Sequence, residues 1–306
     1  MDFFSFLKKF PTELAVIEHF IKVRYQGKVT CRHCAESDYV YHRSTEPKVF
    51  TCHHCKNSFS IFYGTIFENS RTDLRKWFYA LIRMSHVGRK GISAMQLQRE
   101  IGVTYKCAHR MLNFIRIGMG NCDLFNSFEA VVEIDETYIG GKPRKGQVNY
   151  DGNGKPIPIK KGRGTQKIPA IGVYERETGR VYARVALPNK EGKKLTGKQL
   201  LNILECVCRN DTIVVTDEFK GYNILDKKDC NGMIRLKIDH TQAYVSGDVH
   251  TNGIESFWAL LKRGIHGIYH QVSSKYLQRY LDEFCFRMNN RSAYAFDILL
   301  RQCINY

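Results

Sequence analysis

Three carboxylates lie where strands and a helix of one domain could bring them together. Asp135 lies within the run VVEIDETYI, Asp217 ends the run DTIVVTD, and Glu255 lies in the first turn of the helical pattern TNGIESFWALLKRG. Oxygen ligands suit Mg²⁺, which keeps open positions for water and phosphate oxygens. Two such cations about 3.5–4 Å apart would activate an attacking oxygen and stabilise a leaving one. The three acids therefore predict a two-metal site for phosphodiester cleavage.

Each acid also has a purely structural interpretation. Glu133 and Asp135 share a face of one predicted strand, so either could point inward or both could be solvated. Asp217 could cap the helical stretch that follows it. Glu255 stands three residues after Asn252, which is capping-box spacing. The order of strand, strand end and helix favours the catalytic interpretation of the set.

A lysine lies downstream on the same predicted helix. Lys262 follows Glu255 by about two helical turns, so both side chains project from the same side. There it could hold a phosphate beside the metals, or it could simply face solvent. The adjacent Arg263 is rotated off that side and is a candidate DNA contact.

Four cysteines form a second candidate metal site. Two Cys-x2-Cys pairs are separated by seventeen residues, which is typical of a zinc ribbon. Four thiolates would close the tetrahedral shell, so one structural zinc ion is expected, and it would supply folding energy. Nearby histidines are alternative ligands, and a redox or chance pairing is the alternative explanation. The four cysteines are Cys31, Cys34, Cys52 and Cys55, and the histidines are His33, His53 and His54.

The segment ISAMQLQREIGVTYKCAHRMLNFIRIGM predicts two helices that turn at Gly102. Such a helix-turn-helix could place its second helix against DNA. The alternative is an ordinary helical pair with solvated charges. The side chains that we expect the second helix to expose are Lys106, His109, Arg110, Asn113 and Arg116, of which Lys106, Arg110 and Arg116 are the candidate DNA contacts.

The elements predict three parts. Residues 1–70 would form the ribbon, residues 71–122 a helical region, and residues 123–306 an α/β domain with a mixed sheet, because β-branched runs alternate with helical patterns there. An insertion at 142–167 carries eight basic residues and one acidic residue. It is either a solvated loop or an arm that orders on a phosphate backbone. Its candidate DNA contacts are Lys160, Lys161 and Arg163.

Composition and charge narrow the function classes. Apolar residues form 43% of the 306 residues and charged residues 25%, which argues against a disordered chain. Forty-seven Lys and Arg against thirty Asp and Glu give a net charge of +17. A polyanionic partner is the usual reason for such a surplus, with nucleic acid ahead of an anionic membrane surface. No apolar run approaches the roughly 18–20 residues of a membrane span, and the N-terminus lacks a secretion signal pattern. We therefore expect an intracellular protein.

Several blocks resemble bacterial insertion-sequence transposases of the DDE type, the ISXO-like and Merlin-related group also called the fifteen-ninety-five family. The blocks are EIDETYIGGK, VVTDEFKGYN, HTNGIESFWALLKRGIHGIYHQVSSKYLQRYLDEFCFRMNNR and CRHC…CHHCKNSFSIFYGTIFENSRTDLRKW. The resemblance covers nearly the whole chain. It implies a zinc ribbon followed by an RNase H-like catalytic domain with an Asp-Asp-Glu triad.

The resemblance assigns roles to particular residues. Asp135, Asp217 and Glu255 match the triad, and Lys262 matches the downstream basic residue. Asn252 stands in the same block and is the alternative third residue. We favour Glu255, because its carboxylate is the better ligand for a hard cation.

The expected function is DNA transposition. The ribbon and helical region would bind terminal inverted repeats, and the triad would hold two Mg²⁺ or Mn²⁺ ions for cleavage of the transposon ends and strand transfer to target DNA. Joining two ends implies at least a homodimer on double-stranded DNA, with no membrane partner. We expect it in the cytoplasm at the nucleoid, or in a nucleus if the host is eukaryotic. The alternatives are a domesticated sequence-specific DNA-binding protein and a metal-dependent nuclease of the same fold.

Overall fold

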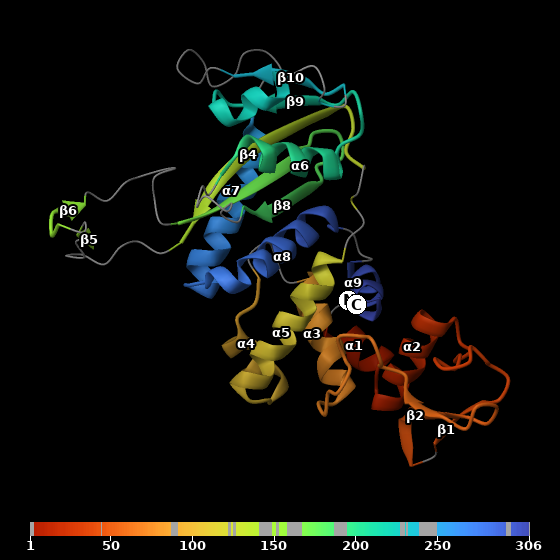
Figure 1. Ribbon diagram of the computed structural model, residues 1–306. Coiled ribbons are helices and arrows are strands. Elements are labelled where there is room, and N and C mark those ends of the chain that lie inside the picture. The colour runs from red at the N-terminus through yellow and green to blue at the C-terminus, as the bar shows by residue number, and fades with distance from the viewer. Residues whose placement is uncertain are drawn as a thin grey trace. The chain divides into compact units, whose positions relative to one another are not determined.

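A computed structural model describes residues 3–43, 45–86, 91–121, 124, 127–140, 149–150, 153–157, 167–186, 195–226, 230, 232–238, 250–291 and 295–305. Its contacts divide the chain into two compact units. The first comprises Met1–Cys122 and Asn290–Tyr306, and the second comprises Asp123–Asn289. Figure 1 labels many of the helices and strands of both units. Among the described residues, no helix is long and apolar enough to cross a membrane.

The first unit begins with two helices that the sequence analysis did not predict. Helix α1 spans Phe3–Lys9 and α2 spans Glu13–Tyr25, with the Thr12 hydroxyl accepting from the Ala15 N–H at the start of α2. Helical periodicity is weak in α2, because the apolar residue Leu14 lies on the exposed side of a helix whose other side is buried. An antiparallel sheet follows, in the order β1-β2-β3. Its strands span Val40–Arg43, Glu46–Cys52 and Ser58–Ser60.

The region predicted to be helical contains three helices. Helix α3 spans Leu74–His86, α4 spans Ala94–Ile101 and α5 spans Tyr105–Gly120. Hydroxyls cap α4 and α5, since Ser93 accepts from Gln96 N–H and Thr104 accepts from Cys107 N–H. Gly102 ends α4 with a left-handed φ of 60°, which glycine adopts without strain. The α4–α5 pair is therefore a helix-turn-helix in shape.

The last helix, α9 (Ala295–Ile304), belongs to the first unit. We assigned it to the C-terminal domain from sequence, and that boundary is wrong for residues 290–306. The physical reason is its apolar face: Phe296 is buried against Phe78 and Phe10, with ring centroids 5.8 and 6.5 Å away. The helix also closes on α5, because a Cβ added to Gly118 would lie 2.4 Å from the sulfur of Cys303. The other predicted domain limits stay predictions.

The second unit is built on a five-stranded mixed sheet in the order β10-β9-β4-β7-β8. Strand β7 is antiparallel to both of its neighbours, β4 and β8, whereas β9 is parallel to β4 and β10 is parallel to β9. This is the RNase H-like arrangement that we expected, with the first strand in the centre. The strands span Val131–Ile139 (β4), Ile168–Glu175 (β7), Val181–Val185 (β8), Ile213–Thr216 (β9) and Ile234–Lys237 (β10).

Helices cover the sheet on both faces, with α6 in front and α7 behind in Figure 1. The face behind the sheet is covered by the apolar sides of α7 and α8, which bury residues such as Phe257, Leu261 and Phe284 against Ala170 and Ala183. The helical segments are α6 (Gly197–Val207), the 3₁₀ segment η2 (Lys220–Asp226), α7 (Asn252–Gly264), its π-helical continuation η3 (Ile265–Tyr269), η4 (Ser274–Tyr276) and α8 (Leu277–Asn289).

Most of the predicted basic insertion at 142–167, including Lys160, Lys161 and Arg163, lies outside the described residues. Its described parts include two short paired strands, β5 (Asn149–Tyr150) and β6 (Pro156–Ile157).

The close approach of α5 and α9 predicts the effect of a single methyl group. We expect Gly118→Ala to lower the free energy of unfolding by about 1–3 kcal/mol, because the added carbon overlaps Cys303. Urea denaturation measures the change. Gly267→Ala is the control, since a Cβ there meets nothing within 4 Å. Adding Cys303→Ala should recover much of the loss, and a strictly additive double mutant would contradict this packing.

Candidate active site and zinc centre

The register between β4 and β9 places Asp135 beside Asp217. Glu133 on β4 is paired with Val215 on β9, and the two strands are parallel. Asp135 and Asp217 each follow their member of that pair by two residues, so both return to the same face of the sheet. Oxygen atoms of the two carboxylates lie within 4.8 Å of each other. The tertiary structure thus brings two of the sequence-predicted acids together.

A third carboxylate in this group is Glu136, which the sequence analysis missed. One of its oxygens lies within 4.8 Å of oxygens of Asp135 and Asp217. Strand alternation alone sends Glu136 to the opposite face from Asp135. However, β9 pairs with β4 only as far as Glu133, so the edge of β4 is free of that neighbour at Glu136. The adjacent Asp-Glu pair at a strand edge was the signal that could have revealed it.

The acids repel one another, and the pKa of Asp135 shows the effect. Burial, followed by the charge of Glu136 and the smaller influences of Asp217 and Glu255, raises the pKa of Asp135 from 3.8 to about 7. A divalent cation would relieve both causes, because it replaces lost hydration and neutralises the crowded charges. The donor set is made of carboxylate oxygens, so it fits a hard cation such as Mg²⁺ or Mn²⁺.

Two neighbouring groups hold these acids in place. The hydroxyl of Tyr222, a fully buried residue of η2, donates to Oε2 of Glu136 over 3.0 Å. Arg235 on β10 donates from Nε to Oγ1 of Thr216 over 2.9 Å and from Nη2 to the backbone oxygen of Asp217 over 3.2 Å. The two bonds from Arg235 fix the segment at the end of β9 that carries Asp217.

The capping interpretation of Asp217 is also correct in part. Its Oδ1 accepts from the N–H of Phe219 over 2.9 Å, just before η2 begins. A carboxylate has two oxygens with several lone pairs, so this bond leaves capacity for a cation.

Helix α7 carries the third predicted acid. Glu255 is exposed in its first turn, and its Oε1 accepts from the Thr251 hydroxyl over 2.9 Å. Glu255 lies outside the group of three acids within 4.8 Å, although its charge still contributes to the pKa of Asp135. Lys262 and the alternative Asn252 are exposed on the same helix. The structure therefore places Glu255 outside that group but close enough for its charge to act on Asp135, and its role as a metal ligand stays a prediction.

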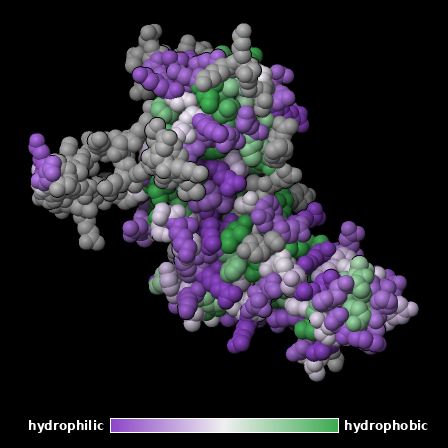
Figure 2. Space-filling model, in the orientation of Figure 1, coloured by the Kyte–Doolittle hydropathy of each residue, from purple (hydrophilic) through white to green (hydrophobic). Residues whose placement is uncertain are grey.

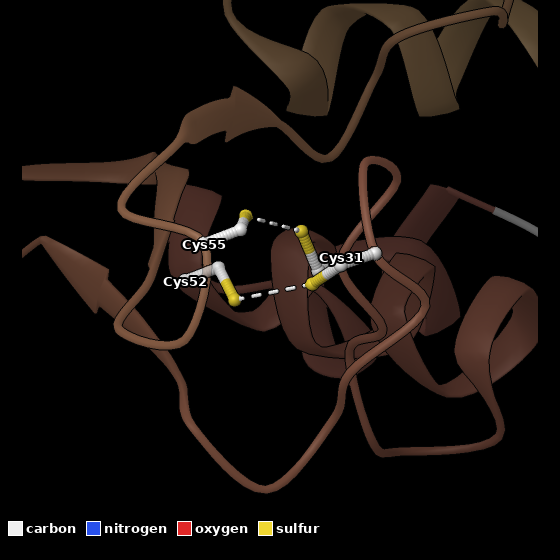
Figure 3. Close-up of side chains that lie close together, drawn as sticks. Cys31, Cys52 and Cys55 are labelled. Atoms are coloured by element: carbon white, nitrogen blue, oxygen red, sulfur yellow. Dashed lines mark hydrogen bonds between the residues drawn. The ribbon is translucent and has the colours of Figure 1, made fainter.

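The four predicted zinc ligands converge in the first unit. Sulfur atoms of Cys31 and Cys55 lie 3.6 Å apart, and those of Cys34 and Cys52 lie 3.7 Å apart. Tetrahedral zinc with Zn–S bonds of about 2.3 Å requires sulfur atoms about 3.8 Å apart. Figure 3 shows Cys52 and Cys55 pointing across toward Cys31 from the opposite loop. The geometry therefore fits a closed, structural zinc site.

The thiols differ in acidity because they share hydrogen bonds. The Asn57 backbone N–H, with smaller contributions from its side chain and from Cys31 and Cys34, lowers the pKa of Cys55 to about 6. At Cys34, the Glu36 backbone N–H favours the thiolate, but desolvation and the neighbouring cysteines outweigh it and raise the pKa to about 12. A zinc ion coordinated by all four thiolates would remove this competition among the cysteines for hydrogen bonds.

The predicted DNA contacts divide into exposed and buried residues. Lys106 and Arg110 are exposed on the first turns of α5, and Arg263 is exposed on α7. Arg116 is 1% exposed and Asn113 is 8% exposed, so our expectation that α5 presents them to DNA is wrong. The C-terminal half of α5 is enclosed by packing against α3 and α9, which sequence periodicity did not reveal.

Two family models match the chain. An ISXO2-like transposase domain matches residues 128–289, and a transposase zinc-ribbon domain matches residues 11–58. A protein of Halobacterium salinarum, described as "Uncharacterized protein in transposable element ISH50", is 30% identical over 288 residues, covering 92% of each chain. An "Uncharacterized transposase-like protein" of Haemophilus influenzae is 27% identical over 125 residues, covering 41% of this chain and 94% of that one.

Two solved structures show weak similarity. A pre-cleavage Mos1 transpososome aligns with a TM-score of 0.31 and 13% identity over 75% of this chain and 78% of that chain. A simian T-cell lymphotropic virus intasome, in complex with the PP2A regulatory subunit B56 gamma, aligns with a TM-score of 0.30 and 11% identity over 62% and 63%. The family models and the relative that matches along nearly its full length decide the assignment. The chain belongs to the insertion-sequence transposases that join an N-terminal zinc ribbon to an ISXO2-like transposase domain.

Proposed function

We propose that this transposase binds the terminal inverted repeats of its element, cuts the transposon ends and joins the freed 3′ strands to target DNA. The observation that carries the proposal is the convergence of Asp135 and Asp217 from adjacent parallel strands. Two like charges held within 4.8 Å are costly unless a cation binds between them. Such an arrangement is typical of sites that transfer phosphoryl groups.

Asp135, Asp217 and Glu255 are the proposed ligands, and Glu136 adds a carboxylate beside the first two. Two divalent cations, Mg²⁺ or Mn²⁺, would supply Lewis-acid activation of the attacking and leaving oxygens. The charge of Lys262, two turns along α7 from Glu255, is available to hold a non-bridging phosphate oxygen.

The bond changes are the same in both steps. In cleavage, a water oxygen attacks the phosphorus at the transposon end, and the bond from phosphorus to the 3′ oxygen breaks. In joining, that 3′-hydroxyl attacks a phosphorus of the target and displaces a 3′ oxygen there. Both steps are in-line displacements, so one set of ligands serves both. Bringing two ends together requires at least two copies of the chain.

DNA recognition is proposed to rest on the first unit and on the predicted basic insertion at 142–167. The exposed start of α5 presents Tyr105, Lys106 and Arg110 after the turn at Gly102, as a recognition helix would. The zinc ribbon and the predicted basic insertion would add contacts to the phosphate backbone. Hydrophilic residues cover much of the face that Figure 2 shows, and the net charge of +17 favours DNA.

The first experiment is a cleavage and joining assay with Asp217→Asn. Labelled DNA carrying the element's ends is mixed with a plasmid target and Mg²⁺ or Mn²⁺. We expect the variant to lose cleavage by roughly three orders of magnitude or more while binding DNA normally, because it loses a ligand and no positive charge. Asp211→Asn, at the opposite end of β9, is the matched control. Equal cleavage by Asp217→Asn and the wild type would reject the assignment.

The same assay separates the alternative functions. Cuts at the ends with no label transferred to the plasmid would indicate a nuclease. Tight DNA binding without any metal-dependent cut would indicate a DNA-binding protein that does not catalyse.

The raised pKa of Asp135 predicts a pH-dependent cost to the fold. Above pH 7, ionisation of this carboxyl lowers the free energy of unfolding of the metal-free protein by its full amount. Below pH 3.8, the pKa of the carboxyl in the unfolded chain, the carboxyl is protonated in both states and has no such effect. Asp135→Asn should therefore raise the free energy of unfolding by roughly 2–4 kcal/mol at pH 8 in EDTA. This gain should shrink toward zero near pH 4. Denaturation at several pH values measures it, and a gain independent of pH would contradict it.

The zinc centre predicts that metal and fold are lost together. Cys52→Ser should reduce bound zinc from one ion per chain to nearly none and unfold the ribbon, with loss of binding to the transposon ends. Elemental analysis and DNA-binding titrations check both effects. Cys206→Ser, at a half-buried cysteine of α6 outside the tetrad, is the control. Full zinc content in Cys52→Ser would show that this cysteine is not a ligand.

A further inference from the structure

A second acid on β4, Glu133, is buried beside the candidate site and fully engaged. Its side chain is 1% exposed. Oε1 accepts from Nε of Arg176 over 2.9 Å, and Oε2 accepts from the backbone N–H of Ile254 over 3.0 Å. Glu133 lies two residues before Asp135 on the same strand face, and Ile254 precedes Glu255 directly. One carboxylate thus links the strand of the first acid to the helix of the third.

Glu133 supplies a hydrogen bond to the start of α7 that the side chain at the helix's own N-cap does not supply. The N-cap residue Thr251 makes no capping bond from its side chain. Its hydroxyl donates to Glu255 instead. The Ile254 N–H is one of the amides left without a partner at a helix start, and Glu133 of the sheet accepts from it. A negative charge also suits the positive end of the helix dipole.

Glycines allow the helix to come this close to the sheet. A Cβ added to Gly253 would lie 2.3 Å from a ring carbon of Tyr174 and 2.9 Å from Oε2 of Glu133. A Cβ added to Gly172, the partner of Asp135 on β7, would lie 2.6 Å from Trp258. The start of α7 therefore packs directly against β4, which carries Glu133 and Asp135, and against β7.

Arg176 extends the link to the residue in front of the helix. Besides donating to Glu133, its Nη2 donates to the backbone oxygen and to Nδ1 of His250. Arg176 is itself fixed to β4, because its backbone N–H donates to the oxygen of Val131. Arg176 thus pairs with the buried charge of Glu133. The chain is also held to the sheet both before Thr251, at His250, and after it, at Ile254.

We propose that Glu133 is a positioning residue that fixes the start of α7, so that Glu255 stays beside Asp135 and completes the metal site. The inference rests on the proposed function, since it assigns Glu255 a share in cation binding. Glu133 would not touch the cation or the DNA. Its effect would reach the site through the helix, and would therefore appear in metal affinity as well as in cleavage.

A purely structural role is the alternative, and a matched residue separates the two. Glu175 on β7 is also 1% exposed and is also paired with an arginine, Arg180, over 3.0 Å. Its Oε1 accepts from the backbone N–H of Glu129 over 2.8 Å, and Oε2 from Arg180 and the Thr178 hydroxyl. None of these three bonds reaches α7.

The test compares Glu133→Gln with Glu175→Gln in the full-length protein. In each variant an amide N–H must face a donor, because both carboxylate oxygens accept hydrogen bonds. Calorimetric titration with Mn²⁺ alone measures metal affinity, hydrogen exchange of peptides covering Ile254 and Glu255 measures the helix start, and thermal unfolding measures global stability. Cleavage of labelled transposon ends is the fourth readout.

For Glu133→Gln we expect Mn²⁺ affinity to fall about tenfold or more, with faster exchange at the start of α7. For Glu175→Gln we expect a similar loss of thermal stability with Mn²⁺ affinity within about twofold of the wild type. Arg176→Lys, which keeps the charge but cannot bridge Glu133 and His250, should give an intermediate loss of affinity. It serves as the test if Glu133→Gln does not fold.

Either of two results would overturn this inference while leaving the proposed function intact. Either Glu133→Gln and Arg176→Lys bind Mn²⁺ as well as Glu175→Gln does, or all three lose affinity equally. In both cases Asp217→Asn would still lose Mn²⁺ binding and cleavage. If Asp217→Asn also retains both, the proposed function itself fails and the inference falls with it.

Discussion

The parallel pairing of β4 with β9 is the constraint on which the candidate site depends. It sets Glu133 opposite Val215, and two residues further along it sets Asp135 beside Asp217. A shift of one residue in this register would turn one aspartate to the other face of the sheet. Among the described residues the pairing with β9 ends at Glu133, so β4 has no partner strand on that side beyond this point, and the acids gather there. The site is thus a consequence of where one strand ends.

Holding acids together in a partly buried place has an energetic cost, and the neighbouring residues reduce it. Tyr222 donates to Glu136, Arg235 braces the segment of Asp217, and Arg176 pairs with Glu133. None of these groups neutralises Asp135, whose pKa rises to about 7. A protein that keeps a strained group uncompensated usually has a functional reason for it. The zinc site solves a similar problem differently, because four converging thiols are expected to be stabilised by the metal itself.

The local elements were largely predictable, because they depend on short-range patterns. Runs of β-branched residues predicted β4 and β9, and helical patterns predicted the region of α3 to α5 and helix α7. Helices α1, α2 and α9 were missed. Helix α2 has an apolar residue, Leu14, on its exposed side, which weakens its helical periodicity, and α9 buries Phe296 against parts of the chain distant in sequence. The same long-range packing explains Arg116: its helix position suggested exposure, but α5 is enclosed on more sides than periodicity could indicate.

Residue types and spacing were enough to predict the chemistry. Two Cys-x2-Cys pairs predict a zinc ligand set, and acids at strand ends in a chain with a charge of +17 predict a metal site facing a polyanion. Tertiary structure decided which side chains meet. Glu136 joins the acids because β9 ends early, Glu255 stands apart on α7, and Glu133 reaches from the sheet to the start of that helix. These are contacts between residues far apart in the chain, and they depend on strand register and helix placement, which no local pattern encodes.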